Sequence, residues 1–172
     1  THPDVLPYAV QYAAAAYDGE KIAVFGGYSN VPENRIIIYD PDTGTSQLGP
    51  DIMGWRGNVP AATYDPNTEN IYVSGGVEGG TYRNNIGYLM PDNSFVNHVD
   101  SLITERAGHA MVYIGDTMYV AGGRYASGEL ASVEKWHSTY HYMTSHDTLQ
   151  VAGVQQPRSY AGYATDGQCL YI

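Results

Sequence analysis

Three short apolar segments of the sequence end in a pair of glycines and recur at a nearly constant interval. They read IAVFGG, IYVSGG and MYVAGG and occupy residues 22–27, 71–76 and 118–123. The second glycine pair follows the first by 49 residues, and the third follows the second by 47. Internal similarity at a period of about 50 residues is typical of propeller arrays, in which each repeat is one small sheet. The chain is therefore expected to fold as repeated β units and not as one packed sandwich.

Two further residue types keep the same register. An arginine opens the segment before the second and third glycine pairs and also precedes a fourth apolar segment, CLYI; these are Arg56, Arg106 and Arg158. An aromatic residue lies 12 or 13 residues past each glycine pair, namely Tyr39, Tyr88 and Trp136. We therefore predict repeats at residues 8–55, 56–105 and 106–157 and an incomplete repeat at 158–172, together one partial domain over 1–172.

Each repeat is expected to be a four-stranded antiparallel sheet. The run RAGHAMVYIGDTMYVAGG, residues 106–123, contains two apolar strands joined by a Gly-Asp turn. Small residues in its first strand suit the innermost strand, which crowds around the axis of a propeller. Glycine after the second strand lets neighbouring backbones approach closely and permits a positive φ. Turn residues interrupt runs of β-branched and aromatic residues about every ten residues, so no long helix is expected.

These features resemble the kelch family, whose repeat has an arginine-opened strand of small residues, an apolar strand ending in Gly-Gly, and aromatics on the third and fourth strands. Residues 106–136 are similar to a whole unit of this kind. The departures are Val10 at the first arginine position and Ser46 and Met143 at two second-aromatic positions, where only Phe95 conforms. The resemblance covers essentially the whole chain. It implies an all-β fold, a kelch-type β-propeller segment of about three and a half four-stranded blades.

A closed propeller takes about four to eight blades, so three and a half blades do not close a ring. An open ring leaves blade faces and an unpaired strand edge in water, which natural proteins avoid. We therefore expect these residues to be part of a longer polypeptide that supplies the rest of the propeller. A second chain that completes the ring is the alternative.

The formal net charge of −10 disfavours binding to nucleic acid or to anionic membranes, since both would repel an acidic chain. No apolar run approaches the roughly 20 residues of a membrane helix, so membrane insertion is not expected either. Many acidic residues stand in turn sequences, where aspartate favours the bend by accepting hydrogen bonds from its own backbone. These are Asp18, Asp40, Asp42, Asp65, Asp92, Asp116 and Asp166. Turn chemistry and solubility explain most of the charge, and a basic partner is the alternative.

No catalytic constellation, phosphate-binding glycine loop or metal-ligand set stands out, so neither a cofactor nor a metal is expected. Within the kelch resemblance, the enzymatic alternative is a copper-radical oxidase similar to galactose oxidase. Such an enzyme needs a cysteine cross-linked to a tyrosine, a Tyr-His pair on an inner strand and a further histidine. Here Tyr140 and His141 fall after Trp136, toward the outer half of a blade, and Cys169 falls just after a turn. We therefore expect a protein that is not an enzyme, with a copper-radical or carbohydrate-processing propeller as the alternative.

The residues expected to bind a partner surround the central channel. In kelch-like interaction domains, the residue after the glycine pair and the residue two places past the arginine tend to reach this face. The resemblance carries these two sets to Tyr28, Val77 and Arg124 and to Tyr12, Asn58, Gly108 and Tyr160. Tyrosine and arginine often anchor protein interfaces. With neighbouring loop residues, the predicted binding set is Tyr12, Tyr28, Asn30, Asn58, Arg124, Tyr125 and Tyr160. The expected function is a non-catalytic scaffold that presents loops from several blades to a protein or peptide.

The cellular compartment stays open between two locations. The single cysteine, Cys169, excludes an internal disulfide and favours the cytoplasm. The scarcity of lysine, with only Lys21 and Lys135, would also suit an extracellular protein. The absence of an N-glycosylation sequon argues mildly against that second location.

Overall fold

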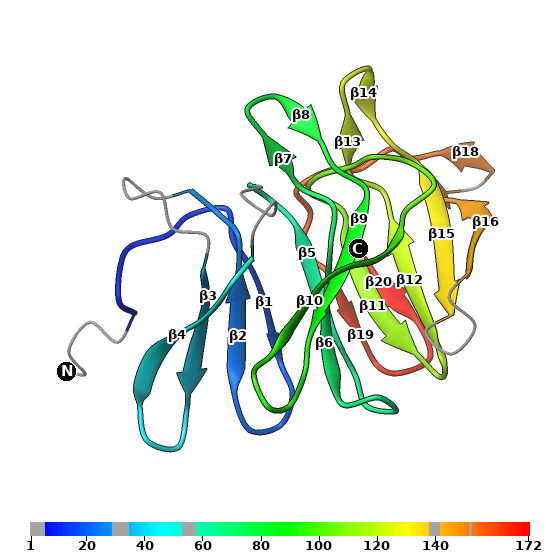
Figure 1. Ribbon diagram of the computed structural model, residues 1–172. Helices are drawn as coiled ribbons and strands as arrows, with labels where there is room; N and C mark the ends of the chain where they lie inside the picture. The colour runs from blue at the N-terminus through cyan, green and yellow to red at the C-terminus, as the bar shows by residue number, and fades with distance from the viewer. Residues whose placement is uncertain (1–5, 29–34, 53–57, 138–141, 152) are drawn as a thin grey trace.

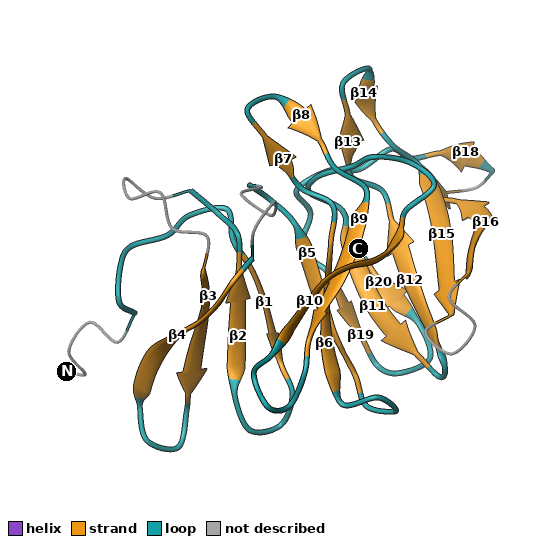
Figure 2. Cartoon of the chain, viewed as in Figure 1, coloured by secondary structure: helices purple, strands orange, loops and turns teal. Residues whose placement is uncertain are grey.

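The chain folds as a row of small antiparallel sheets, as the repeats predict (Figures 1 and 2). The structure is a computed structural model that describes residues 6–28, 35–52, 58–137, 142–151 and 153–172. Within these residues there is no helix, and hence none that could span a membrane. Three four-stranded sheets and four two-stranded hairpins account for the strands. The all-β prediction is confirmed.

The strands follow one another along the chain within each sheet. The first sheet contains β1 (Ala14–Tyr17), β2 (Ile22–Phe25), β3 (Arg35–Asp40) and β4 (Thr45–Asp51). The second contains β5 (Ala61–Asp65), β6 (Asn70–Ser74), β9 (Asn85–Leu89) and β10 (Phe95–Ser101). The third contains β11 (Ala110–Ile114), β12 (Thr117–Ala121), β15 (Ser132–His137) and β16 (Tyr142–Thr148). The hairpins are β7–β8 (Val77–Glu78, Thr81–Tyr82), β13–β14 (Arg124–Tyr125, Gly128–Glu129), β17–β18 (Gln150–Val151, Val154–Gln155) and β19–β20 (Ala164–Thr165, Leu170–Tyr171).

Each four-stranded sheet is one blade of a propeller. Its strands are hydrogen-bonded in chain order, with the first strand innermost. The innermost strands β1, β5, β11 and β19 lie next to one another in that order, so the blades are arranged around a common axis. The β7–β8 and β13–β14 hairpins project at the upper end in Figure 1, and the β1–β2, β3–β4 and β5–β6 turns lie at the lower end. The fold is therefore a propeller segment of three blades and an inner hairpin.

The glycine pairs join neighbouring blades. All six glycines have a positive φ, from 61° to 105°, which a side chain would strain. The N–H of Gly76 donates a hydrogen bond of 2.8 Å to the carbonyl oxygen of Arg106, and the N–H of Gly123 donates one of 2.6 Å to that of Arg158. A Cβ atom on Gly75 would collide with the Arg106 carbonyl oxygen. The glycines thus allow the backbones of neighbouring blades to approach closely, as the sequence predicts.

The core lies between the faces of adjacent blades. One apolar cluster fills the space between the first and second sheets, and another the space between the second and third. Trp136 on β15 is completely buried in the latter, with its ring centroid 5.1 Å from that of Tyr72 and its Nε1 donating to Asp100 Oδ2 at 2.7 Å. Area burial of this kind is the main favourable term in folding.

The structure corrects one of the aromatic equivalences. Tyr39 pairs with Ile22 and Trp136 pairs with Met118, each opposite the first apolar residue of the second strand. In the second blade the residue opposite Ile71 is Leu89, not Tyr88. Tyr88 lies one position earlier and packs toward the third blade. Its spacing from the glycine pair fits the repeat, but its position in the sheet is not equivalent to that of Tyr39 and Trp136.

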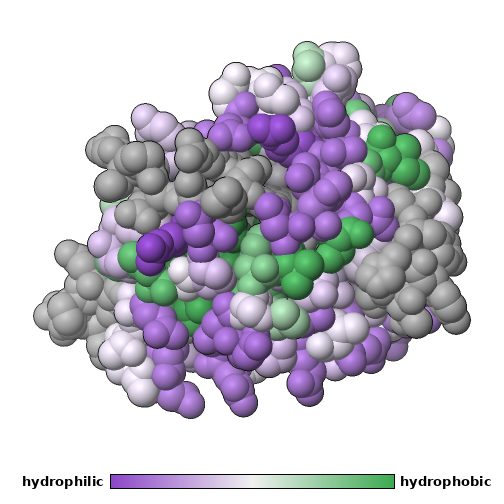
Figure 3. Space-filling model, viewed as in Figure 1, coloured by the Kyte–Doolittle hydropathy of each residue, from purple (hydrophilic) through white to green (hydrophobic). Residues whose placement is uncertain are grey.

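Five of the seven predicted turn aspartates accept hydrogen bonds from nearby backbone N–H groups. Asp18 Oδ1 accepts hydrogen bonds from the backbone N–H groups of Glu20 and Lys21, at 2.9 and 2.8 Å. The same arrangement recurs at Asp40, Asp65, Asp92 and Asp166. The backbone hydrogen bonds lower the pKa of Asp40 and Asp166, and the hydroxyl of Ser94, followed by its backbone N–H, lowers that of Asp92. Figure 3 shows hydrophilic residues along the lower edge of the molecule, where the turns of Figure 1 lie. Asp18, Asp40 and Asp65 stand in these turns and place negative charge at this end of the propeller.

Candidate binding surface at the channel mouth

Four residues form a backbone ladder that links the blades at the upper end of the axis. The N–H of Val59 donates to the carbonyl oxygen of Tyr12 at 2.7 Å, that of Gly108 to Val59 at 2.9 Å, and that of Tyr160 to Gly108 at 2.9 Å. Each of the four has a φ between 57° and 61°. We call this row the inner ladder. It fixes the position of the residues that border the channel mouth.

The inner ladder corrects the register of the predicted set. Tyr12, Gly108 and Tyr160 are equivalent, as expected, but the second blade contributes Val59 in place of Asn58. Asn58 instead forms a bridge with Val77, in the way that Gln11 does with Tyr28 and Ala107 with Arg124. In the sequence Val59 lies three residues past Arg56, whereas Gly108 and Tyr160 lie two residues past their arginines. Counting two residues from each arginine therefore selects Asn58 in the second repeat, one position too early.

A pocket of about 490 Å³ opens beside the inner ladder. Tyr12, Tyr160 and Tyr163 line it, with the small side chains of residues 13–15 on the wall and His109 among the lining residues. Tyr12 and Tyr160 are 60% and 54% exposed although each holds a left-handed backbone conformation. For a bulky residue that conformation costs about 1–3 kcal/mol, and such strain is frequent at binding sites.

The Tyr160 side chain is held over the channel mouth by two neighbours. Its ring covers Gly108, where an added Cβ would come within 2.8 Å of Tyr160 Cδ1. The hydrogen bond between Arg124 and Tyr160 raises the pKa of the Arg124 guanidinium above its ordinary value. Arg124 forms no salt bridge within the described part of the chain. The carboxylate of Glu129, opposite Arg124 on β14, adds to the rise in the pKa of Arg124.

The remaining predicted residues lie near this centre or outside the described residues. Tyr28, 53% exposed, exchanges backbone hydrogen bonds of 2.7 and 3.1 Å with Gln11, next to Tyr12. Tyr125 packs on Tyr82, with ring centroids 5.5 Å apart, so the β13–β14 hairpin is supported by β7–β8. Asn30 lies outside the residues that the structure describes. The structure thus brings Tyr12 and Tyr160 to one pocket. Arg124 lies outside the pocket lining but contacts Tyr160, Tyr28 pairs with Gln11 next to Tyr12, and Tyr125 lies on the β13–β14 hairpin.

His109 is a pocket residue that sequence reasoning missed. It is buried, and its Nε2 lies 2.9 Å from Ser74 Oγ on the neighbouring blade. Burial, with the nearby charge of Arg106, lowers the pKa of His109 to about 3, so the imidazole is neutral at physiological pH. Its place in RAGHAM, directly after the small residues of the innermost strand, was the available signal. A neutral, immobilised imidazole offers hydrogen bonding and no charge.

Arg106 has a structural role. Its guanidinium donates to the Gly122 carbonyl oxygen at 2.8 Å and to Ser132 Oγ at 3.0 Å, and it forms an ion pair with Glu134. The arginine and the glutamate are 0% and 2% exposed. Arg106 therefore links the glycine pair of its own blade to β15 through hydrogen bonds and an ion pair.

The residues considered for a copper site lie partly outside the part of the chain that the structure describes. Among the described residues, no group of three His, Cys, Asp or Glu side chains could hold a metal ion. Cys169 is exposed, and His137 Nε2 lies 3.2 Å from Thr117 Oγ1. Tyr140 and His141 lie outside the described residues.

Comparison with known proteins agrees with this architecture. A family model described as "Kelch motif" matches residues 10–53 and 105–139. A search of curated proteins finds no match. Among solved structures 168 chains match, including one described as "Structure of YjhT", with a TM-score of 0.71 and 13% sequence identity. That likeness covers 90% of this chain and 55% of the other, so this chain spans about half the length of that protein. With kelch motifs in its first and third blades and repeated four-stranded sheets, the chain is a kelch-type β-propeller segment.

Proposed function

We propose that this chain is part of a non-catalytic kelch propeller that binds a protein or peptide at the channel mouth. The supporting observation is that exposed Tyr12 and Tyr160 border one pocket, where Tyr160 is joined to Arg124. Loops supply these groups, while their backbones are fixed by the inner ladder. Side chains on loops of a rigid scaffold do not pack in the core, so they can contact a ligand without a loss of stability. The remaining blades, from the same longer chain or from a second chain, complete the ring around this site.

Charge supports a partner segment that carries carboxylates. The turn aspartates gather at the lower end of the propeller, whereas Arg83, Arg124 and Arg158 lie at the end that bears the inner ladder and its hairpins. Arg83 is paired with Glu78 at 2.8 Å, and Arg124 has no such partner among the described residues. An acidic segment is therefore attracted to the arginine end and repelled from the other. A guanidinium binds a carboxylate with two parallel hydrogen bonds, which lysine does not reproduce.

The experiment is a selection of peptides from a random display library on the intact protein, followed by calorimetric titration of the most enriched sequence. The Arg124→Ala variant should weaken its binding by more than about 1 kcal/mol, or about fivefold, because an interface anchor is lost. Its free energy of unfolding should change by no more than about 0.5 kcal/mol, as for an ordinary surface substitution. Tyr12→Ala should weaken binding in the same way.

Two matched variants complete the design. Lys135→Ala removes one positive charge away from the channel mouth, and Tyr17→Ala removes a tyrosine that is 53% exposed at the acidic end. Both should leave the affinity unchanged. If the selected peptides bind the Arg124→Ala and Tyr12→Ala proteins as tightly as the parent, the channel mouth is not the binding surface. A lowered melting temperature of Arg124→Ala would assign this arginine a structural role instead.

A further inference from the structure

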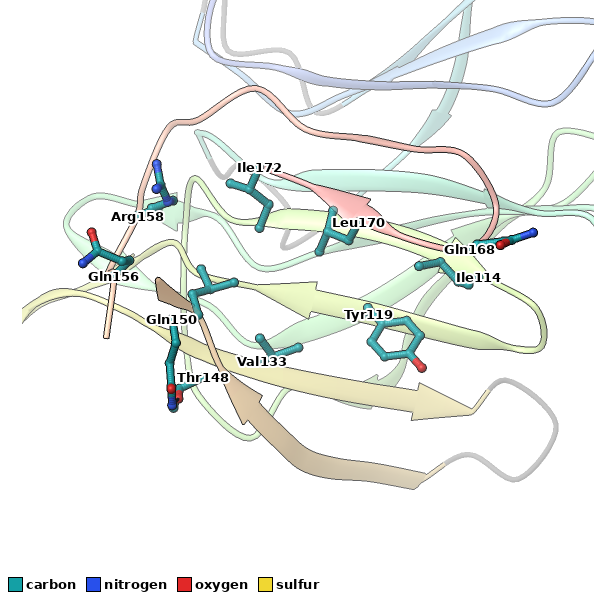
Figure 4. A pocket seen from close by; sticks show the side chains of 11 residues that line it. Ile114, Tyr119, Val133, Thr148, Gln150, Gln156, Arg158, Gln168, Leu170 and Ile172 are labelled. Atoms are coloured by element: carbon teal, nitrogen blue, oxygen red, sulfur yellow. Dashed lines mark hydrogen bonds between the residues drawn. The ribbon is translucent and has the colours of Figure 1, made fainter. Parts of the chain in front are cut away.

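A hollow of about 460 Å³ on the side of the propeller separates β12 and β15 from β20. Figure 4 shows Leu170 and Ile172 on one side of it and Tyr119 and Val133 on the other. In each complete blade a third strand pairs with the second strand at the corresponding place. This hollow is therefore the place of a strand and is not a ligand site. The pocket of about 490 Å³ beside the inner ladder is different, because residues of four successive repeats line it.

The pocket beside the inner ladder has neutral walls. Tyr12, Tyr160 and Tyr163 supply aromatic rings, and the alanines of residues 13–15 supply small apolar groups. No aspartate, glutamate, lysine or arginine is among its lining residues. The imidazole of His109 is neutral because burial and the charge of Arg106 lower its pKa to about 3. A charged group that enters the pocket loses its water and meets no opposite charge there, which is costly.

Contacts to other blades hold the aromatic walls in place. The hydroxyl of Tyr163 donates to the carbonyl oxygen of Ala62 on β5 at 3.4 Å, so this side chain extends from the fourth repeat to the second blade. The Tyr160 ring covers Gly108 and is hydrogen-bonded with Arg124. Tyr12 and Tyr160 are also fixed through the inner ladder. A ligand therefore meets rings that are already positioned, which lowers the entropy lost on binding.

The three tyrosine rings favour an aromatic occupant over an aliphatic one. A pair of aromatic rings adds roughly two- to tenfold to the affinity beyond the effect of the area that it buries. Aromatic rings also bind organic cations, but the guanidinium of Arg124, bonded to Tyr160, opposes a second positive charge. The volume of about 490 Å³ lies within the range of small-ligand sites, roughly 300–1,000 Å³, and admits a large side chain.

We propose that this pocket binds one aromatic side chain of the partner segment, a tryptophan or a tyrosine, with an acidic residue of the partner beside it. The inference rests on the proposed function and adds to it the group that enters the pocket. Ala161 determines this specificity. It follows Tyr160 in the inner ladder as His109 follows Gly108, and its single methyl group leaves the space that the aromatic ring occupies.

The probes are synthetic peptides Gly-Ser-Asp-X-Glu-Ser-Gly, blocked at both ends, in which X is tryptophan, leucine, lysine or glycine. They are titrated into the intact protein by calorimetry. The tryptophan peptide should bind most tightly and the leucine peptide roughly two- to tenfold more weakly, because a leucine forms no ring pairs. The lysine peptide should bind no better than the glycine peptide, because no carboxylate lines the pocket.

Two variants change the pocket and one serves as control. Ala161→Leu fills the pocket and should remove the preference for tryptophan over glycine without changing the affinity for the glycine peptide. Tyr163→Leu removes one ring and should reduce the affinity ratio between the tryptophan and leucine peptides. Gln47→Leu adds the same side chain at an exposed position on the outer strand β4 and should change neither preference.

The outcomes separate this inference from the proposed function. Equal affinities for the tryptophan and glycine peptides, both weakened by Arg124→Ala, would overturn the inference and leave the proposed function standing. A tryptophan preference that persists in a stably folded Ala161→Leu protein would overturn it as well. If neither these peptides nor any selected from the display library bind, the proposed function fails and the inference fails with it.

Discussion

Replacing Glu134 by glutamine should destabilise the protein strongly although it removes only one charge. Glu134 Oε1 forms the ion pair with Arg106 and accepts from the N–H of Thr104 at 3.1 Å, while Oε2 accepts from the N–H of Ile103 at 2.7 Å. Glutamine keeps one acceptor oxygen and turns the other into an NH₂ group. That group faces either a backbone N–H or the guanidinium, so donor meets donor.

The magnitude depends on the burial of the pair. Removing one partner of a buried ion pair costs about 3–5 kcal/mol, because the other charge is left uncompensated. Arg106 keeps its hydrogen bonds to Gly122 and Ser132, so we expect the lower part of that range, about 3 kcal/mol. For a chain of this length, 1 kcal/mol lowers the melting temperature by about 2–4 °C, which gives a decrease of about 6–12 °C.

The matched control is Glu78→Gln, which breaks the ion pair with Arg83 at the surface. Those two side chains are 30% and 39% exposed, so solvent screens the pair and the loss should stay below about 1 kcal/mol. Urea unfolding followed by tryptophan fluorescence, with Trp136 as the buried reporter, measures both variants. If Glu134→Gln and Glu78→Gln shift the unfolding midpoint equally, burial does not control the energy of the Arg106 pair.

Three further variants test other parts of the structure. Burial lowers the pKa of His109 from its ordinary value of 6.5 to about 3. The unfolded state therefore takes up a proton at a higher pH than the folded state does, so the free energy of unfolding should fall as the pH drops. Between pH 6.5 and pH 5 the loss is about 2 kcal/mol, and it should be absent in His109→Gln when both proteins are melted across that range. Gly75→Ala should lower the free energy of unfolding, measured by chemical denaturation, more than Gly79→Ala does. Both glycines have a φ near +60°, but only at Gly75 does an added Cβ meet a backbone oxygen. Equal losses of stability would contradict this reasoning. Trp136→Phe should lower stability by about 2 kcal/mol, since it loses an indole hydrogen bond and leaves a void, and a thermal melt within 1 °C of the parent would refute that role.

Much of the fold could be predicted from the sequence because its signals are local. Apolar strands, turn aspartates and glycine pairs act within a few residues of their own position, and all three behave as expected. The period of about 50 residues then fixed the architecture, because a sheet of four short strands with apolar faces must stack on a copy of itself. The kelch resemblance, and not the period, placed Tyr12, Arg124 and Tyr160 at the channel face, and their role in binding stays a prediction.

Only the tertiary structure decided which residues face one another. Spacing placed Asn58 and Tyr88 in the repeat register, but backbone hydrogen bonds give those places to Val59 and Leu89. Repeat lengths vary by one residue: Val59 lies three residues past its arginine where Gly108 and Tyr160 lie two past theirs, and Leu89 and Trp136 lie 13 residues past their glycine pairs where Tyr39 lies 12. The pair of Arg106 and Glu134 joins residues 28 positions apart, which no local pattern reveals. The sequence alone determined that arginine opens a strand. Arg106 is buried and paired because β15 brings Ser132 and Glu134 against it, and burial sets the energy of a charge whereas local sequence does not.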